Sequence, residues 1–236
     1  MEIIQLNDLH KIYNEGIIEV NAVNGISLTI AEGEFTAIVG PSGSGKTTLL
    51  NLIGGLDKPT RGEVFINGTE ITKLKSKELI NFRLNNIGFV FQSYNLIPVL
   101  TAHENVEFIM QLQNKPVAER HKRTIELLES VGLGDKNDVR PRHLSGGQQQ
   151  RVAVARALAS KPRFILADEP TANLDSKATA NLLEIMERLN HEEKMTFLFS
   201  THDQRVVSKA HRVITIEDGK VISDIEQEQL AHSTHI

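Results

Sequence analysis

The sequence of 236 residues contains no cysteine and no tryptophan. The absence of cysteine excludes disulfide bonds, thiolate metal sites and thiol catalysis, and it agrees with a reducing compartment. Long hydrophobic runs are also missing, because "FTAIVG" and "FILA" are far shorter than the roughly 18 to 20 residues that span a bilayer. The opening "MEIIQLNDLHKIY" has no basic flank followed by an apolar run, so we expect no secretory signal. Any membrane role would therefore act through a partner.

A strong charge of either sign is lacking as well. The 26 basic and 30 acidic side chains leave a formal net charge of −4. Such a chain offers no overall cationic field for nucleic acid or anionic lipid, so nucleic acid is not an expected partner. The hydrophobic content of 40% and the length suffice for one large domain, or for a core that carries a smaller lobe.

The order of apolar patterns indicates an α/β fold. Short β-branched runs separated by turn signals predict strands in the first third of the chain, and "FTAIV" leads directly into a glycine-rich loop and a helix. Residues 102–113, 117–133 and 147–160 have helical patterns, and in the second of these Ile125, Leu128 and Val131 share a face.

The last third of the chain returns to strands. "FILAD" and "TFLFST" are nearly all apolar, as strands buried on both faces are, and "RVITIEDGKVISDI" predicts a strand pair. Between the two buried strands lies a predicted helix whose apolar stripe is formed by Leu182, Ile185, Met186 and Leu189.

The stretch "GPSGSGKTT" fits G-x-x-x-x-G-K-[ST] between a predicted strand and a predicted helix, which is the context of a phosphate-binding loop. Lys46 should reach the β- and γ-phosphates, and the Thr47 hydroxyl should bind Mg²⁺. The alternative is a glycine-rich turn without a ligand. The nucleotide contacts expected here come from Gly40, Pro41, Ser42, Gly43, Ser44, Gly45, Lys46, Thr47 and Thr48.

Two adjacent acids end the apolar run in "FILADEP". We expect Asp168 to bind Mg²⁺ through a water, and Glu169 to polarise the attacking water. Their roles should differ because successive residues on a strand point in opposite directions. The alternative is a strand end followed by a proline stop.

A second glycine motif lies in "HLSGGQQQRVAVARALA", His143 to Ala159. A phosphate-binding loop encloses a triphosphate from one side only, whereas transition-state charge needs neutralisation on all sides. The Ser145 hydroxyl, the amides of Gly146 and Gly147, and a helix N-terminus could supply this, with Gln148 beside them. Ordinary helix capping by Ser145 is the alternative.

Taken together, the phosphate loop, "LSGGQ" and "LADEP" resemble the ATP-binding cassette (ABC) family, whose signature sequence is LSGGQ. The resemblance covers residues 2 to 224. It implies a P-loop NTPase with a mainly parallel sheet, an N-terminal antiparallel β subdomain and a helical subdomain. The implied parts are a core of about 2–91 and 160–224, a helical subdomain of about 92–159, and a tail of 225–236.

The resemblance further implies ATP and Mg²⁺ as ligands, and a head-to-tail homodimer in which the LSGGQ of one copy completes the site of the other. Tyr13 in "KIY" is similar to the aromatic residue that stacks on adenine, and Gln92 in "GFVFQ" to the residue that senses Mg²⁺ and the attacking water. His202 in "STHD" is similar to the histidine that contacts the γ-phosphate, and Asp175 ends a segment expected at the dimer interface. Each has a structural alternative: a strand-end aromatic for Tyr13, a loop amide for Gln92, and a helix-start polar residue for His202.

Within the family, "GGLDKPTRGEVFING" and "GFVFQSYNLIPVLTAHENV" are similar to the group that acts in lipoprotein release and in macrolide or peptide export. This implies a peripheral ATPase on the cytoplasmic face of the cell membrane, bound to an integral membrane permease. The bacterial cell-division ATPase is a near relative, so mechanical signalling is a second interpretation.

An apolar patch of Leu96, Ile97, Pro98 and Leu100 is where a membrane subunit would dock, unless these side chains pack inside the helical lobe. A soluble ABC ATPase of DNA repair or translation is a further alternative. It is less favoured because the chain has a single cassette and no cysteine for a zinc module. An unrelated P-loop kinase would have no use for LSGGQ.

Overall fold

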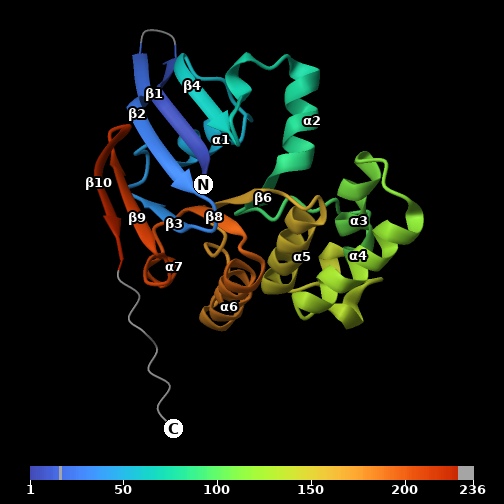
Figure 1. The fold of residues 1–236 in the computed structure, drawn as a ribbon. Helices are drawn as coiled ribbons and strands as arrows, with labels where there is room; N and C mark the ends of the chain where they lie inside the picture. Colours follow the sequence, from blue (N-terminus) through green and yellow to red (C-terminus); the bar gives the residue numbers. More distant parts are fainter. Residues whose placement is uncertain (16–17, 228–236) are drawn as a thin grey trace.

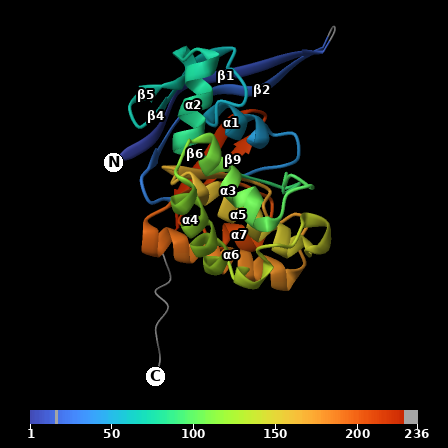
Figure 2. The same ribbon diagram turned by 90° about the vertical axis from the view of Figure 1, so that its right-hand side faces the viewer.

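A computed structural model describes residues 1–15 and 18–227 of the protein. Residues 228–236 of the predicted tail lie outside the described residues. The described chain forms a mixed α/β structure with two sheets: a group of helices covers one face of the larger sheet, and one helix lies between the two sheets on its other face (Figures 1 and 2). The predicted fold class is confirmed.

The larger sheet has six strands within the described residues, in the order β10-β9-β3-β8-β7-β6. All neighbouring pairs are parallel except β9 and β10, which form the predicted antiparallel pair. Strand β10 continues two residues into the predicted tail. The strands are β3 (Phe35–Val39), β6 (Ile87–Phe91), β7 (Phe164–Asp168), β8 (Thr196–Ser200), β9 (Arg212–Glu217) and β10 (Lys220–Glu226).

The smaller sheet is antiparallel and has the order β2-β1-β4-β5 in the described residues. Its strands β1 and β2 pair over most of their length, with several register shifts that bend the ribbon. The elements of this region are β1 (Glu2–Glu15), β2 (Ile18–Ala31), β4 (Arg61–Ile66), β5 (Thr69–Glu70) and the short 3₁₀ helix η1 (Ile71–Lys73).

Most of the longer helices pack together against one face of the larger sheet. Helices α3, α4 and α5 pack on one another and on the β6 side of the larger sheet, while α6 covers the same face further along (Figure 1). Their bounds are α1 (Lys46–Ile53), α2 (Ser76–Asn86), α3 (Ala102–Leu112), α4 (Val117–Ser130), η2 (Gly134–Lys136), η3 (Pro141–His143), α5 (Gly146–Ala159), α6 (Ser176–Glu193) and α7 (Gln204–Val207).

The sequence patterns did not predict helix α2 or strand β6. Helix α2 lacks an apolar stripe, and none of its residues, all of which are described, is buried. It is held at its N-terminus by a capping box, in which the Glu78 carboxylate accepts a hydrogen bond from the Lys75 N–H at 2.9 Å. Hydrophobic periodicity cannot reveal a helix of this kind.

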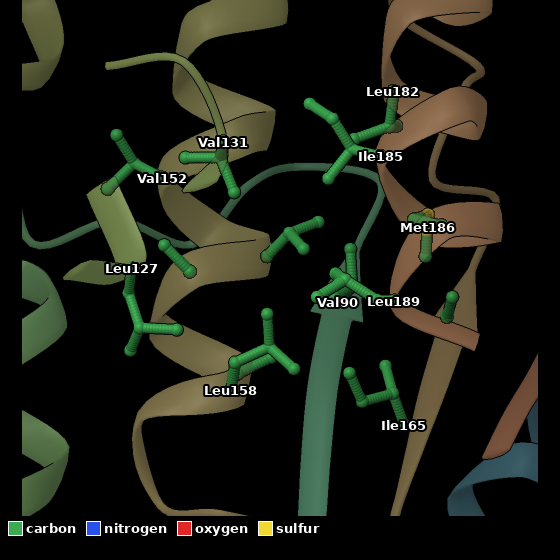
Figure 3. Close-up of a cluster of buried hydrophobic side chains, with 14 of the residues drawn as sticks. Val90, Leu127, Val131, Val152, Leu158, Ile165, Leu182, Ile185, Met186 and Leu189 are labelled. Carbon is green, nitrogen blue, oxygen red and sulfur yellow. The ribbon is translucent and has the colours of Figure 1, made fainter. Parts of the chain in front are cut away.

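One hydrophobic cluster joins the helices to the sheet (Figure 3). It places Val90 of β6 and Ile165 of β7 together with side chains from α4, α5 and α6, so the helical region has no separate core. The predicted stripe on α6 is buried throughout. The stripe predicted for α4 is partly wrong, because Ile125 is only half-buried and Leu127 lies in the core instead.

A second cluster lies between the two sheets and contains helix α1. Leu49, Leu52 and Ile53 of this helix are buried against strands of both sheets. In the part of the chain that the structure describes, no helix is both long and apolar enough to cross a membrane.

Candidate functional site

The predicted site residues follow the carboxyl ends of four neighbouring parallel strands. The strands β3, β8, β7 and β6 lie side by side in that order. The glycine loop follows β3, His202 follows β8, Asp168 ends β7, and Gln92 follows β6. Because the carboxyl ends of parallel strands meet at one edge of a sheet, segments far apart in sequence converge there.

A pocket of about 740 Å³ opens at this edge. Tyr13, Val20 and Ala22 of the antiparallel sheet also line it. Most predicted residues line it, while Ser44 and Asp168 lie just behind the lining. The predicted residues in the lining are Tyr13, Gly40, Pro41, Ser42, Gly43, Gly45, Lys46, Thr47, Thr48, Gln92, Glu169 and His202.

The loop keeps its shape because its glycines have backbone angles that other residues avoid. Gly45 has φ 102°, and a Cβ placed on it would lie 2.0 Å from the carbonyl oxygen of Ala22. Gly40 meets the Ile216 carbonyl in the same way, also at 2.0 Å. Strands β2 and β9 therefore press against the loop, and only glycine fits at these two positions.

Lys46 lies across the loop. Its buried side chain donates hydrogen bonds from Nζ to the carbonyl oxygens of Gly40 at 2.9 Å and Pro41 at 2.8 Å. Helix α1 begins at the same residue, so its positive end faces the loop. Within the described structure, the buried Ser44 hydroxyl has no hydrogen-bond partner. A fixed cation and a helix N-terminus suit a chain of phosphates.

Thr47 and Asp168 form an oxygen pair beside the loop. The Thr47 hydroxyl donates to Asp168 Oδ1 at 3.0 Å. Such hard oxygens suit Mg²⁺, which typically takes one or two protein oxygens and completes its shell with phosphate and water. Among the described residues no group of three or more His, Cys, Asp or Glu side chains is arranged to hold a metal ion. The pair therefore fits an Mg²⁺ ion that is held jointly with a nucleotide.

Glu169 differs from Asp168 for a reason other than the predicted one. Strand β7 ends at Asp168, and Glu169 has a left-handed backbone with φ 46°, so strand alternation does not apply to it. Its N–H donates to the Ser200 carbonyl at 2.8 Å, which ties the turn to the end of β8. A non-glycine residue in this conformation costs on the order of 1–3 kcal/mol and is frequent at functional sites.

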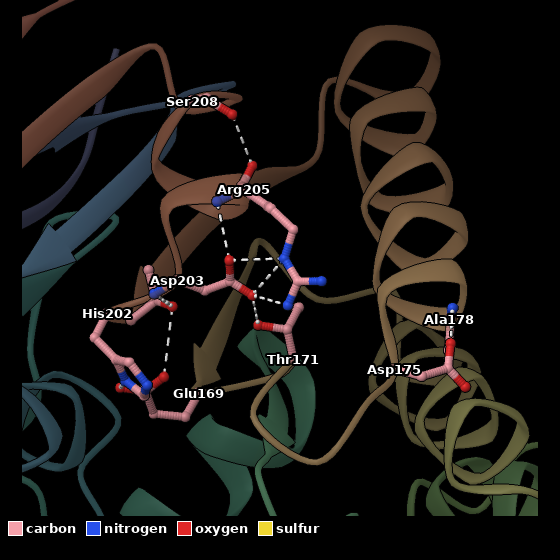
Figure 4. A network of polar contacts seen from close by, with 9 residues as sticks. Glu169, Thr171, Asp175, Ala178, His202, Asp203, Arg205 and Ser208 are labelled. Atoms are coloured by element: carbon pink, nitrogen blue, oxygen red, sulfur yellow. Dashed lines mark hydrogen bonds and ion pairs between the residues drawn. The ribbon is translucent and has the colours of Figure 1, made fainter.

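The Glu169 carboxylate is held by two residues that follow β8 (Figure 4). His202 donates from Nδ1 to Glu169 Oε1 at 2.8 Å, and Thr201 Oγ1 contacts Oε2 at 3.4 Å. The glutamate side chain is only 16% exposed, whereas the His202 side chain is 73% exposed. The sequence predicted separate roles for Glu169 and His202, and the structure joins them in one hydrogen bond.

A second polar network lies behind this pair and was not predicted (Figure 4). Asp203 accepts from the Thr171 hydroxyl at 2.9 Å and from Arg205 Nη2 at 2.7 Å. Hydrogen bonds from Arg205 are the main reason that the pKa of Asp203 falls to about 2, and burial opposes this effect. The network connects the turn after β7 to the turn after β8, and so supports the positions of Glu169 and His202.

The segment after strand β6, which contains Gln92, is held by side chains from two other parts of the chain. The Gln92 carbonyl accepts from Asn173 Nδ2 at 3.0 Å, and Arg156 of α5 donates to the carbonyls of Tyr94 at 2.9 Å and Asn95 at 2.5 Å. Tyr94 and Asn95 are both left-handed. Sequence reasoning did not select Arg156, and it included Asn173 only in the segment ending at Asp175 that was expected at a dimer interface. Their contacts are backbone carbonyls, which no sequence pattern identifies.

The second glycine motif does not reach this pocket. Among the described residues that line it, none comes from Ser145–Gln148. Ser145 instead caps α5: its Oγ accepts from the Gln148 N–H at 3.3 Å, and Gln148 Oε1 accepts from the Ser145 N–H at 2.9 Å. The capping interpretation is thus correct within one chain.

Close packing explains the two glycines of this motif. A Cβ on Gly146 would lie 2.8 Å from the Tyr94 hydroxyl, and one on Gly147 would lie 2.8 Å from the Ala178 Cβ. Both glycines belong to helix α5. The motif is therefore wedged between the segment after Gln92 and the start of α6, where Asp175 caps the helix by accepting from the Ala178 N–H at 2.8 Å.

A separate groove of about 620 Å³ runs between α2, β6 and the helices α3 and α5. Its lining is mostly apolar and includes Ile80, Phe89, Ile97 and Leu112. Only part of the predicted apolar patch is correct. Ile97 lines the groove and Pro98 is exposed, but Leu96 packs against the core and Leu100 is half-buried.

Comparison with known proteins gives the following matches. The ABC transporter family matches residues 23–172. An uncharacterized ABC transporter ATP-binding protein of Thermotoga maritima is 50% identical over 220 residues, which cover 93% of this chain and 94% of that protein. The macrolide export ATP-binding/permease protein MacB of Hyphomonas neptunium is 48% identical over 229 residues. These cover 97% of this chain but 35% of MacB, so the chain spans about a third of that relative.

A solved structure has the same fold. It is the ATP-binding cassette MJ0796, described as a dimer in a post-hydrolysis state bound to ADP and Pi. The TM-score is 0.89 at 44% sequence identity, and the match covers 96% of this chain and 99% of that one.

Proposed function

Because this chain belongs to the ABC transporter family, we propose that it is the ATP-hydrolysing unit of an export system, in which two copies close head to tail on ATP. That it is an ABC ATPase follows from the family match and from the fold shared with the MJ0796 cassette. One observation carries the residue assignments: four neighbouring strand ends gather the glycine loop, the Thr47–Asp168 pair and the Glu169–His202 pair at one pocket.

In this proposal the loop binds the phosphates. Its amides and Lys46 bind the β- and γ-phosphate oxygens, so Lys46 exchanges its two carbonyl partners for the nucleotide. Thr47 and Asp168 hold Mg²⁺, which neutralises charge on the β- and γ-phosphate oxygens when it is bound. Tyr13 lines the same pocket, and we assign to it the contact with the base.

Glu169 then orients the water that attacks the γ-phosphate. His202 and Thr201 hold the carboxylate, which is thus already directed before the nucleotide arrives. Nδ1 donates to Glu169, so Nε2 of His202 would donate to a γ-phosphate oxygen in the ring that carries both protons. Gln92 lines the same pocket, and we assign to it the contact with Mg²⁺ and the water.

The open side of the pocket is closed by the second copy. We assign this role to Ser145, Gly146, Gly147 and Gln148, which lie at a helix N-terminus yet line no part of their own pocket. A helix N-terminus with a hydroxyl group favours an anion, and a partner copy can present it to the γ-phosphate. The dimeric MJ0796 structure supports such an arrangement.

A membrane permease is the proposed partner. The mostly apolar groove beside Ile97 offers a surface for it, and the name of MacB joins an ATP-binding part to a permease. Such a partner would place this ATPase at the cytoplasmic face of the cell membrane. The exported molecule is proposed only as a class, namely a macrolide, peptide or lipoprotein.

The decisive variant is Glu169→Gln. We expect ATP hydrolysis to fall by about 100-fold or more, because the variant loses the carboxylate that polarises water, while ATP binding persists. ATP should then convert the variant from monomer to stable dimer, as measured by light scattering on a sizing column. Lys46→Ala is the matched control and should remain monomeric because it binds ATP weakly. A Glu169→Gln protein that stays monomeric with saturating ATP would contradict head-to-tail closure.

A further inference from the structure

We propose that Asp57 and Lys11 are positioning residues that fix the Tyr13 ring as a platform for the base of the nucleotide. The inference rests on the proposed function, because it concerns the base end of the same pocket. Neither residue lines the pocket, and neither belongs to a nucleotide-binding motif.

The lining of the pocket points to Tyr13 as the base contact. Besides the glycine loop, the lining includes Tyr13 and Val20, which are direct partners across strands β1 and β2. Both side chains are partly exposed, Tyr13 by 36% and Val20 by 44%. A nucleotide whose phosphates bind the loop therefore presents its planar base to an aromatic ring and an aliphatic side chain.

Two side chains, those of Asp57 and Lys11, form the support behind this ring. The Tyr13 hydroxyl donates to Asp57 Oδ2 at 2.7 Å, and Lys11 Nζ donates to Asp57 Oδ1 at 2.8 Å. Lys11 also donates to the Lys58 carbonyl at 2.8 Å, and its Nζ lies 4.8 Å from the centre of the Tyr13 ring. Lys11 and Tyr13 are two residues apart on strand β1, so their side chains lie on the same face of the strand. One ring face is thus covered by Lys11, and the ring is tethered at its tip by Asp57.

The negative charge of Asp57 and the positive charge of Lys11 strengthen the hydrogen bonds that hold the Tyr13 ring. Burial acts to raise the pKa of Asp57, but hydrogen bonds from Lys11 and Tyr13 outweigh it, so the pKa lies below its ordinary value. Burial, with a contribution from Asp57, raises the pKa of Tyr13, so the phenol stays a donor. Lys11 and Asp57 are also largely shielded, with side chains 13% and 30% exposed. The bonds to this carboxylate are charge-assisted and stronger than neutral ones.

A tethered ring improves nucleotide binding because its side-chain freedom is lost before the ligand arrives. Ordering one such side chain on binding costs affinity, and the cost corresponds to roughly three- to tenfold in Kd. The support should act only on ligands that have a base. The hydrogen bonds of Asp57 and Lys11 go to one another, to Tyr13 and to Lys58, and only Tyr13 is also bonded to a loop residue, Thr48. The support should therefore not change the rate of the bound complex.

The test compares ATP with inorganic tripolyphosphate, which has phosphates but no base. For Asp57→Ala in the full chain we expect the Kd for ATP and the KM to rise about three- to tenfold, with kcat and the Kd for tripolyphosphate unchanged. Asp57→Asn keeps an acceptor for the Tyr13 hydroxyl and should recover part of the loss. Glu32→Ala, which removes an exposed acid at a turn away from the pocket, is the matched control and should change neither ligand.

A double-mutant cycle with Tyr13→Phe separates positioning from a general structural role. Without the phenol hydroxyl the tether is already broken, so Asp57→Ala should add less than twofold to the Kd for ATP. Unchanged ATP binding in Asp57→Ala would overturn the inference, and so would an equal loss for tripolyphosphate. A wild-type protein that binds neither ligand would overturn the proposed function itself, and the platform with it.

Discussion

The two glycine motifs both begin a helix, yet the structure uses glycine in them for different reasons. In the loop before α1, Gly45 has a left-handed backbone and is pressed against the Ala22 carbonyl. In the motif before α5, Gly146 and Gly147 are helical and are required by side chains packed against them. The first motif shapes a pocket of its own chain, whereas the second is packed tightly in place and lines none of it.

This difference shows that a glycine-rich helix start does not imply a pocket in the same chain. The first motif is surrounded by its predicted chemical partners, including Asp168 and Glu169, because four parallel strands end beside it. The second has no such neighbours and lies against Tyr94 and Ala178. The N-terminus of α5 has no nucleotide pocket of its own chain beside it. It can therefore bind a nucleotide only when the pocket of another copy lies against it, which is the basis of the proposed dimer.

The largest difference between the two motifs should appear in ATP binding when one glycine of each is replaced by alanine. Gly45→Ala should reduce ATP binding beyond measurement, because the new Cβ would meet backbone 2.0 Å away in a strained conformation. Gly146→Ala should bind ATP normally, since its Cβ meets the far end of the Tyr94 side chain, but should hydrolyse it several-fold more slowly. Isothermal titration and a phosphate-release assay measure both. If both variants lost ATP binding to the same extent, the proposed difference between the two motifs would be wrong.

A smaller effect tests whether the second motif acts on the other copy. Ser145→Ala should slow hydrolysis about tenfold or more through a lost transition-state contact. It should also lower Tm by about 2–4 °C, because an N-cap contributes about 1 kcal/mol. Mixing Ser145→Ala with Lys46→Ala chains should restore hydrolysis, since one site of each mixed dimer then has both an intact loop and an intact motif. Activity equal to the average of the separate variants would argue against action between copies.

The smallest effect concerns the Asp203 network, which supports the first site. Asp203→Asn should destabilise the fold by about 1 kcal/mol at pH 7, since a charge-assisted hydrogen bond is lost. Because the folded-state pKa of Asp203 is depressed to about 2 from 3.8, this contribution is present above pH 4 and is lost as the pH falls toward 2. Urea unfolding of both proteins across this range measures it. A difference that persists at pH 2 would show that the carboxylate charge is not its cause.

Much of the fold could be predicted because strong local patterns match the final structure. Strands with buried faces on both sides, such as β3 and β7, are nearly all apolar, and α6 has a clear stripe. Helix α2 could not be predicted in this way, because its position depends on capping and on half-buried contacts. Leu96 was misplaced because exposure depends on which distant core the segment meets.

The candidate site was predictable where a motif is contiguous and not where contacts are distant. Lys46 and Thr47 follow directly from the loop sequence and both line the pocket. The Glu169–His202 hydrogen bond and the Asp57–Tyr13 tether each join residues far apart in the chain. Lys11 had a local signal, because it is two residues from Tyr13 on a strand, but its contact with Asp57 had none.

By itself, the sequence determined which chemical groups the protein has and the order of its helices and strands, since glycine freedom, apolar periodicity and helix capping act over a few residues. Only the tertiary structure decided which groups meet. The order of β3, β8, β7 and β6 sets this, because parallel strands bring their carboxyl ends together irrespective of distance along the chain. It also decided that the Ser145 motif lies away from its own pocket, since packing against Tyr94 and Ala178 fixes the position of α5.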